Sequence, residues 1–397
     1  MALMLVAGAC STPGSSAGGS GADPGASARD GQAMPVAESK GDLQVVARFY
    51  EALPTGVAVS DQGRIFVSFP RWGDRAGYTV AEIDSGKPIP YPSATANQFD
   101  ASQPTRRLAS VDNLVVGPLN DLWILDTGRP HFNWRIADAA KLVRVDLATD
   151  QVIQTIVFPE QVARKSSYLS DVRIDMSRGP EGMAYVTDAS EMGLNGLIVV
   201  DLATGESWRK LDLHPSTRAQ QEFLPIVEGR PMLFDPKGRS PSHVTLGVNG
   251  IALAPDGDRV FYRPLASRKM YSVRTDTLTD RDLAPRRVAD TMRSYGDLGF
   301  ASDGIVADDK GRIYMTNIED QAIVRRRADG SLETLVYDPR LLWPDSLAIA
   351  GGYLYITTNQ RHRRAVFNGG RNRTEKPYVL FRLPIDAGPV ALRSKTQ

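Results

Sequence analysis

Residues 249–262 contain the pattern that decides the fold, and they read Asn249-Gly-Ile-Ala-Leu-Ala-Pro-Asp-Gly-Asp-Arg-Val-Phe-Tyr262. A polar residue opens this segment, a short apolar run follows, Pro, Asp and Gly mark a turn, and a second run rich in apolar residues ends it. Short apolar runs bounded by turn residues are typical of β-strands, whereas an amphipathic helix needs a longer run with a period of 3.6 residues. The segment therefore predicts a β-hairpin.

The same pattern occurs six times along the chain. Its opening residues, which are small or polar, are Thr55, Asp112, Asp171, Asn249, Asp303 and Asp345. Each repeat is long enough for a four-stranded sheet, and sheets of this kind bury both faces when they pack around a common axis. The sequence thus predicts an all-β fold, a six-bladed β-propeller over residues 42–390. A two-domain β-sandwich protein is the alternative.

Two features outside the hairpins predict how the ring is completed. Residues 43–50 form an alternating segment, and we expect it to pair with the last strands near residues 378–383, because strands from both chain ends commonly complete one blade. The long step between the third and fourth repeats contains residues 217–243, which are rich in Pro, Gly and charge. We expect this insertion to form a long loop over one end of the ring.

The N-terminal segment differs in composition from the rest of the chain. Residues 1–10 are a short apolar run that ends in small residues and Cys10, which resembles the end of a bacterial lipoprotein signal segment. A buried cysteine in a frayed terminus is the alternative. Residues 11–41 are rich in Gly, Ser, Ala and Pro, so we expect a flexible linker, a disordered N-terminal tether. Together they predict an exported protein, either a periplasmic or outer-membrane-anchored lipoprotein lipidated at Cys10, or a secreted one.

Composition excludes several classes of function. The chain has 47 Lys and Arg against 46 Asp and Glu, so its charge favours neither nucleic acid nor a membrane surface as partner, and we expect membrane contact only through a lipid anchor. One cysteine rules out an internal disulfide and leaves too few thiolates for a zinc or iron–sulfur site. No nucleophile elbow, Walker loop or dinucleotide motif occurs. The basic run Arg361-His-Arg-Arg364 is predicted to be a solvated loop.

The opening residues of the repeats are the main candidates for a site. A propeller places them at the start of each innermost strand, so they are expected to ring the central channel. Carboxylates that close together repel, and a ring of them must be protonated, bridged by a cation or bound to a basic ligand. Oxygen ligands suit Ca²⁺. The alternative is that these residues only cap turns. Arg71-Trp72 and the segment from Arg129 to Trp134 are candidates for lining a pocket mouth or for packing the outer blades.

Four sets of segments carry a more specific signal. They are Ser60-Asp-Gln-Gly-Arg-Ile-Phe-Val-Ser-Phe-Pro-Arg-Trp72, Leu122-Trp-Ile-Leu-Asp-Thr-Gly-Arg129, residues 196–209 with His214-Pro-Ser216, and Gly250-Ile-Ala-Leu-Ala-Pro-Asp-Gly257 with Tyr262-Arg-Pro-Leu-Ala-Ser267. These segments resemble the Yellow / major royal jelly protein family, including its L-dopachrome tautomerase-related members. The match covers nearly all of residues 42–385. It implies a secreted six-bladed propeller, with small aromatic amines bound in the central cavity of some relatives and dopachrome conversion in others.

A more distant resemblance is to the gluconolactonase and regucalcin-like calcium propellers. It implies a metal held on the innermost strands, for which Asp171, Asn249 and Asp303 are the matching ligands. Thr55 stands where that family has a glutamate, and Asp112 or Asp345 is then the candidate for the missing charge.

Three functions remain open from the sequence. In the first, the channel binds a small aromatic or amine ligand through Thr55, Asp112, Asn249, Asp345 and Arg129, with Asp171 and Asp303 as candidate bases for an isomerase of the dopachrome tautomerase type. The second is a Ca²⁺-dependent lactonase, in which the metal polarises a lactone carbonyl and an Asp activates water. The third is a non-enzymatic anchored scaffold. The oligomeric state is not predicted.

Overall fold

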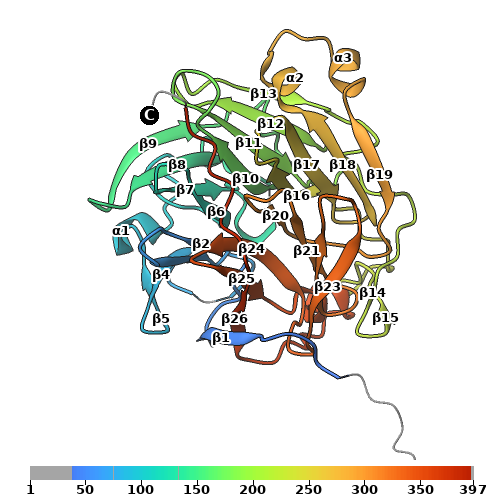
Figure 1. Cartoon of the computed structure of the whole chain (residues 1–397). Coiled ribbons are helices and arrows are strands. Elements are labelled where there is room, and N and C mark those ends of the chain that lie inside the picture. Colours follow the sequence, from blue (N-terminus) through green and yellow to red (C-terminus); the bar gives the residue numbers. More distant parts are fainter. Residues whose placement is uncertain (1–37, 75, 133, 395–397) are drawn as a thin grey trace, which may run out of the picture. The chain divides into compact units, whose positions relative to one another are not determined.

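The computed structural model describes residues 38–74, 76–132 and 134–394. The predictions for Cys10, for residues 1–10 and for most of the tether concern residues outside the described ranges. The following description concerns the unit from Ser39 onward, which forms six antiparallel sheets of four strands each (Figure 1). This confirms the predicted six-bladed propeller and excludes the two-domain sandwich.

The blades follow one another along the chain, and each runs from an innermost to an outermost strand. The first three blades are β2 (Val57–Val59), β3 (Ile65–Ser68), β4 (Val80–Asp84) and β5 (Lys87–Pro90); β6 (Val111–Val116), β7 (Asp121–Asp126), β8 (Lys141–Asp146) and β9 (Gln151–Val157); and β10 (Leu169–Asp175), β11 (Met183–Asp188), β12 (Gly196–Asp201) and β13 (Ser207–Lys210). The fourth and fifth are β16 (Val248–Leu253), β17 (Arg259–Pro264), β18 (Lys269–Arg274) and β19 (Arg293–Asp297); and β20 (Ile305–Ala307), β21 (Ile313–Asn317), β22 (Ala322–Arg326) and β23 (Leu332–Tyr337).

The sixth blade joins the two ends of the propeller chain. It contains β24 (Pro344–Ala350), β25 (Tyr353–Thr358) and β26 (Tyr378–Pro384), with β1 (Gln44–Phe49) as its outer strand. The pairing of β1 with β26 is antiparallel, with Phe49 opposite Tyr378. The predicted ring closure is therefore confirmed, and it ties the start of the propeller to its end.

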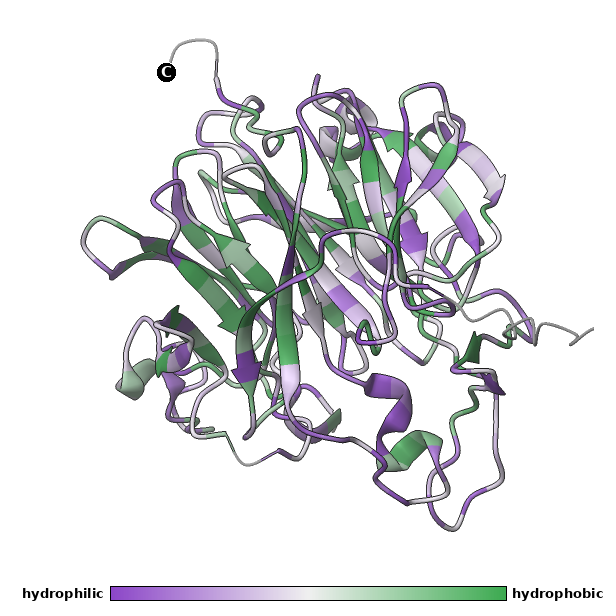
Figure 2. Ribbon diagram, turned by 60° about the horizontal axis from the view of Figure 1, so that its bottom comes forward, coloured by the Kyte–Doolittle hydropathy of each residue, from purple (hydrophilic) through white to green (hydrophobic). Residues whose placement is uncertain are grey.

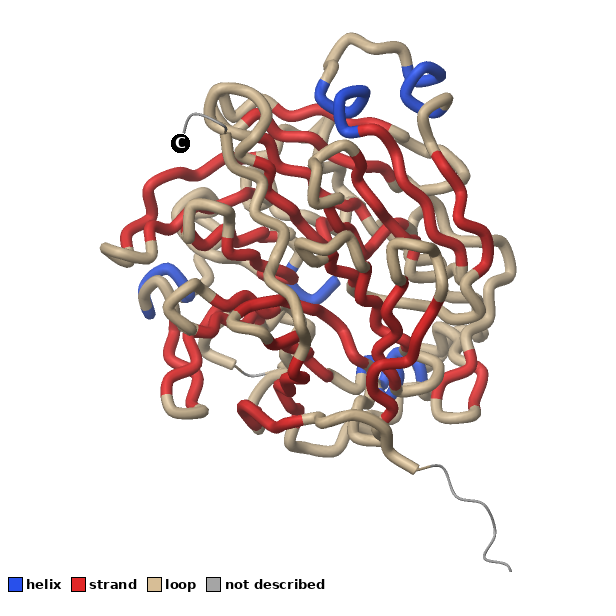
Figure 3. The backbone as a smooth tube through the Cα atoms, viewed as in Figure 1, coloured by secondary structure: helices blue, strands red, loops and turns tan. Residues whose placement is uncertain are grey.

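In the described part of the chain, helices are few and short. They are α1 (Ala94–Asn97), α2 (Thr275–Thr279) and α3 (Pro285–Ala289), with single 3-10 turns at Pro130–Phe132, Arg361–Arg363 and Ala365–Phe367. Strands make up most of the regular structure in Figure 3. None of the helices in the described ranges has the length and apolar character needed to cross a membrane.

The core lies between neighbouring blades. Between the second and third, for example, Trp123, Leu142, Val172, Val186 and Ile198 pack in one buried cluster. Figure 2 shows hydrophobic residues along the strands and hydrophilic residues concentrated in the connections. Each blade thus buries its faces against the next, as the propeller argument requires.

The two ends of the channel are covered by different segments. The insertion at residues 217–243 contains the short hairpin of β14 (Ile226–Val227) and β15 (Arg230–Pro231), and its Phe223 and Met232 pack with Trp343. At the other end, the chain after β26 crosses the ends of the innermost strands, where Asp309 N–H donates to Gly388 O at 3.1 Å and Met176 N–H donates to Leu392 O at 3.0 Å. This C-terminal segment is the dark red coil across the middle of Figure 1.

Candidate functional site

The upper ring of the channel is a connected set of polar side chains at the starts of the innermost strands. We define it as Thr55, Asp112, Ser170, Asn249, Asp303 and Asp345. Thr55 Oγ1 donates to Asp112 O at 2.6 Å, and Ser170 Oγ donates to Asp112 Oδ2 at 3.2 Å. Ser170 Oγ also bonds to Asn249 Oδ1, and Asn249 Nδ2 donates to Asp303 Oδ1. Five of the six predicted residues therefore come together.

β-bulges and glycines shape this ring. Strand register shifts where four of the ring residues lie, between Val111 and Asn113, Leu169 and Val172, Val248 and Gly250, and Pro344 and Leu347. A bulge adds a residue to one strand and redirects its side chain. The innermost strands also approach closely, since a Cβ on Gly250 or Gly304 would lie only 2.7 or 2.3 Å from the backbone oxygen of Asp303 or Asp345. Small residues after the ring position therefore bring the ring side chains together.

Asp171 is not part of the upper ring, contrary to expectation. Ser170 takes the ring position, and the Asp171 carboxylate pairs with Arg173 Nη1 at 2.6 Å and accepts from Asn113 Nδ2 at 3.0 Å. The extra residues of the bulge in β10 cause the difference, because the pattern aligned Asp171 where the strand actually presents its predecessor. An alignment on Val172, the apolar residue that corresponds to Ile251 and Ile305, would have identified Ser170.

Burial shifts the acidities of the ring carboxyls. It raises the pKa of Asp112 to about 7, although hydrogen bonds from Tyr168 and Ser170 act in the opposite direction. Burial also raises the pKa of Asp303. The pKa of Asp345 is raised well above its usual value by burial and then by the charges of Asp303 and Asp112. The buried ring therefore favours the protonated forms of its carboxyls, and Asp112, with a pKa of about 7, titrates near neutral pH.

Arg361 supplies the positive charge of the site. It is only 5% exposed, and its charge acts on Asp112, Asp303 and Asp345. Its guanidinium is nevertheless held by stacking, 4.9 Å from the centre of the Trp72 ring, and Nε is buried without a hydrogen-bond partner. Within the described part of the chain, no carboxylate forms an ion pair with this guanidinium. The prediction of a solvated basic loop is thus wrong for Arg361.

Aromatic side chains cover the ring and orient its carboxylates. Tyr168 O–H donates to Asp112 Oδ1 at 2.8 Å and accepts from Trp72 Nε1 at 3.0 Å. Phe132 stacks on both, with ring centres 5.1 Å from Trp72 and 5.6 Å from Tyr168. On the other side, Trp343 Nε1 donates to Asp303 Oδ2 at 2.7 Å. Each of these two carboxylates is therefore fixed by a donor on an aromatic ring.

Arg129 supports this aromatic group from behind. It is 2% exposed, pairs with Glu191 at 2.8 Å, and lies 5.8 Å from the centre of the Tyr168 ring. It therefore packs beneath the site, and Trp134 is 64% exposed at the surface. Of the predicted pocket-mouth residues, Trp72 and Phe132 belong to the aromatic cover of the ring.

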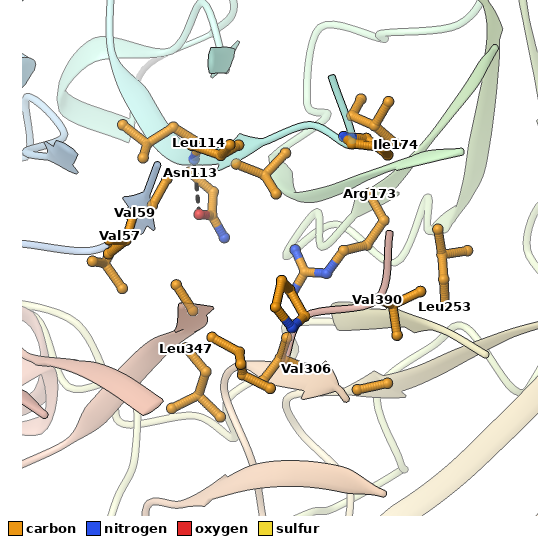
Figure 4. A pocket seen from close by; sticks show the side chains of 18 residues that line it. Val57, Val59, Asn113, Leu114, Arg173, Ile174, Leu253, Val306, Leu347 and Val390 are labelled. Atoms are coloured by element: carbon orange, nitrogen blue, oxygen red, sulfur yellow. Dashed lines mark hydrogen bonds between the residues drawn. The ribbon is translucent and has the colours of Figure 1, made fainter. Parts of the chain in front are cut away.

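The lower bore of the channel is a separate region. It is a cavity of about 90 Å³ lined mainly by apolar residues, among them Val57, Leu114 and Leu347, and it is bordered by Val390 of the C-terminal segment (Figure 4). Arg173 reaches into it and donates to Ile305 O at 2.7 Å as well as to Asp171. The charges in this region are thus paired with each other.

The residues expected to hold Ca²⁺ do not fit a metal site. Asp171 is paired with Arg173, while Asn249 and Asp303 bond to each other in the upper ring. The amide oxygen of Asn249 is used by Ser170. Across the described ranges, no three His, Cys, Asp or Glu side chains are grouped so as to hold a metal ion. The three predicted ligands therefore do not converge.

The comparisons with known proteins identify the family. The model of the major royal jelly protein family matches residues 109–380. This chain belongs to that family. The resemblance to the Yellow and royal jelly proteins is thus confirmed.

Relatives and structural neighbours agree with this assignment. The chain is 28% identical to Protein yellow of Drosophila melanogaster over 289 residues, which cover 69% of this chain and 50% of that protein. It is 26% identical to Yellow-related salivary protein LJM17 of Lutzomyia longipalpis over 275 residues, or 64% of this chain and 62% of that protein. The chain spans about half the length of the Drosophila relatives it matches.

Two solved structures share the fold. The calcium-binding protein regucalcin of Agrobacterium tumefaciens has a TM-score of 0.53 and 13% identity, with 87% of this chain and 95% of that chain covered. A putative gluconolactonase has a TM-score of 0.51 and 11% identity, with 89% and 95% covered. These likenesses concern the propeller fold alone.

Proposed function

We propose that the upper ring binds a small aromatic ligand that carries both a cationic nitrogen and a hydrogen-bond acceptor, and that it catalyses a tautomerisation of the dopachrome type. One observation carries the proposal: a buried guanidinium, Arg361, faces three buried carboxyls without pairing with any of them. Asp112 and Asp345 keep 7% and 8% exposure.

The charges of the site complement such a ligand. A cationic amine beside Asp112 and Asp303 favours their ionised forms, because it compensates the burial that raises their pKa. The N–H groups of Arg361 are available to an acceptor on the ligand, and the rings of Trp72, Phe132 and Tyr168, which stack on one another, provide aromatic surface next to the ring carboxyls. Amine and aromatic recognition are thus both provided by residues at one place.

Asp112 is the proposed base. A carboxyl with a pKa of about 7 can take up and release a proton near neutral pH. In the proposed step, Asp112 takes a proton from a ring carbon. The C–H electron pair forms a new C=C bond, the π pair of a conjugated carbonyl moves onto its oxygen, and that oxygen takes a proton from solvent. Asp112 then returns its own proton to solvent. The product is an isomer, so neither an oxidant nor a reductant is needed.

Titration with dopamine and serotonin, followed by calorimetry, tests the binding proposal. We expect saturable binding that weakens at least tenfold in Asp112→Asn and in Asp303→Asn, with Asp171→Asn in the lower bore as the matched control. We also expect proton release on binding near pH 7, seen as a dependence of the heat on the buffer. Equal affinities in all four proteins would exclude the ring as the ligand site.

Catalysis has its own measurement. The absorbance of L-dopachrome is followed with and without protein, and Asp112→Asn should lose the rate that depends on a group titrating near pH 7. If the protein binds the amines but does not convert dopachrome, it is a ligand-binding protein and not an enzyme of this type. If it neither binds the amines nor converts dopachrome, the scaffold hypothesis is favoured. We also propose that the chain is exported, which is supported by its salivary relative.

A further inference from the structure

A second cavity lies beside the channel, between the hairpin of β14 and β15 and the segment from His362 to Glu375. Its volume is about 360 Å³. The charged and titratable residues in its lining are Glu228, Arg230, His362, Arg363, Arg373 and Glu375. None of them belongs to the upper ring, so this cavity is a separate candidate site.

The carboxylate of Glu228 in this cavity already has hydrogen-bond partners. Glu228 accepts from His362 Nε2 at 2.6 Å and from Arg363 Nε and Nη2 at 2.8 and 2.6 Å. The hairpin turn holds it there, since Glu228 and Gly229 both adopt positive φ, 50° and 72°. These contacts lower the pKa of Glu228 to about 2, Arg363 contributing most, so it stays ionised.

Two arginines of the lining have no such partner. Among the described residues, neither Arg230 nor Arg373 forms a side-chain ion pair or hydrogen bond, and both are exposed. Glu375 lies 3.7 Å from Arg363 and is 84% exposed at its side chain. With three arginines against two glutamates, the lining carries an excess of positive charge, which attracts an anion.

His362 adds a specific polar group. Its side chain is only 7% exposed, and Nδ1 is buried with no hydrogen-bond partner among the described residues. Because Nε2 bonds to a carboxylate, the neutral ring carries its proton on Nε2 and presents Nδ1 as an acceptor. The imidazole of His362 therefore holds Glu228 at the cavity wall through Nε2.

We infer that this cavity binds a small oxyanion, such as the anion of a hydroxy acid or a phosphate. Arg230 and Arg373 attract the anionic group. The inference rests on residues outside the upper ring and stands independently of the proposed channel activity.

The test is calorimetric titration of the full chain with gluconate and, separately, with inorganic phosphate at low ionic strength. The double variant Arg230→Ala/Arg373→Ala should weaken binding at least tenfold. Arg371→Ala, an exposed arginine of the same loop outside the cavity lining, is the matched control and should change it less than twofold. Binding of gluconate alone would identify a hydroxy acid site, and binding of phosphate alone a phosphate site.

Two outcomes would overturn the inference. One is the absence of saturable binding of either probe. The other is equal weakening in Arg371→Ala, which would show only general attraction to a basic loop. Asp303→Asn keeps oxyanion binding if the inference is right, whether or not the channel binds amines, so the two proposals fail separately.

Discussion

The upper ring and the lower bore are lined by the same innermost strands, yet among the described residues their charged side chains are paired in the bore and unpaired in the ring. In the bore, Arg173 and Asp171 form one close pair at 2.6 Å, and Arg173 also satisfies a backbone oxygen. In the ring, Arg361 faces several carboxyls and is paired with none in the described structure. A paired set of charges holds a structure together, whereas an unpaired buried set is available to a ligand.

The largest expected effect tests the paired charges of the bore. Arg173→Ala leaves Asp171 buried without its partner, so we expect the free energy of unfolding to fall by about 3–5 kcal/mol. The comparison variant Arg361→Ala removes no ion pair, and the ring carboxyls can take up protons instead. Its loss should be below about 2 kcal/mol, measured by urea unfolding at pH 7. Equal losses would remove the distinction between the two regions.

The pH dependence of stability tests the unpaired carboxyls of the upper ring. Burial raises the pKa of Asp112 from 3.8 to about 7, so the folded protein holds a proton that the unfolded chain releases between these values. The contribution of the Asp112 carboxyl to stability is therefore greatest at low pH and is lost as the pH rises through 7. Between pH 5 and 8 the loss from this group is about 2–3 kcal/mol.

Asp112→Asn should remove that part of the pH dependence. We expect its stability relative to the unmodified protein to improve from pH 5 to pH 8, as measured by urea unfolding at both values. The control is Asp386→Asn, because neighbouring Arg312 and Lys310 lower the pKa of Asp386 to about 2. The contribution of Asp386 to stability is therefore lost as the pH falls into the acid range, whereas that of Asp112 is lost as the pH rises. The same slope in Asp112→Asn and in the unmodified protein would contradict the assigned pKa.

A smaller effect tests the ring position taken by Ser170. Ser170→Ala removes the hydrogen bond to Asp112, so we expect a loss of about 1 kcal/mol. The pKa of Asp112 should rise further, because that bond favours the ionised form. Titration of the Asp112 carboxyl by NMR measures it, with Ser170→Thr as the variant that keeps the hydroxyl. An unchanged pKa would show that Ser170 is not part of the ring.

The smallest effect concerns the C-terminal segment below the bore. Asp386 is exposed and pairs with Lys310 and Arg312. We expect Asp386→Asn to leave the thermal midpoint unchanged, because exposed ion pairs contribute little. Hydrogen exchange should be faster at the Asp309 amide, which bonds to Gly388 O. A marked drop in the thermal midpoint would show that this segment is essential to the fold.

Much of the fold was predictable because its signals are local. The repeated hairpins and the inserted loop follow from apolar runs and turn residues that are close in the chain. The closing pair of β1 and β26 follows from the general rule that strands from both chain ends complete one propeller blade. The error at Asp171 has a different origin: a bulge changes which residue faces the channel, and the repeat pattern alone did not reveal the bulge.

The residues that complete the site were not predictable in the same way. Arg361 belongs to a run of basic residues that resembles a solvated loop, and Tyr168 and Trp343 lie outside the repeated pattern. They reach Asp112 and Asp303 only because the ring closes and brings distant segments to one axis. The side chain of Arg361 is only 5% exposed because of that closure.

The amino-acid sequence by itself determined the six hairpins and most of the polar residues at their starts, because strand and turn preferences depend on neighbours in the chain. Only the tertiary structure decided which charges are paired and which are not. Electrostatic energy depends on the distance between charges and on their burial. Residues such as Asp112 and Arg361 become buried and close to each other only when the blades have closed into a ring.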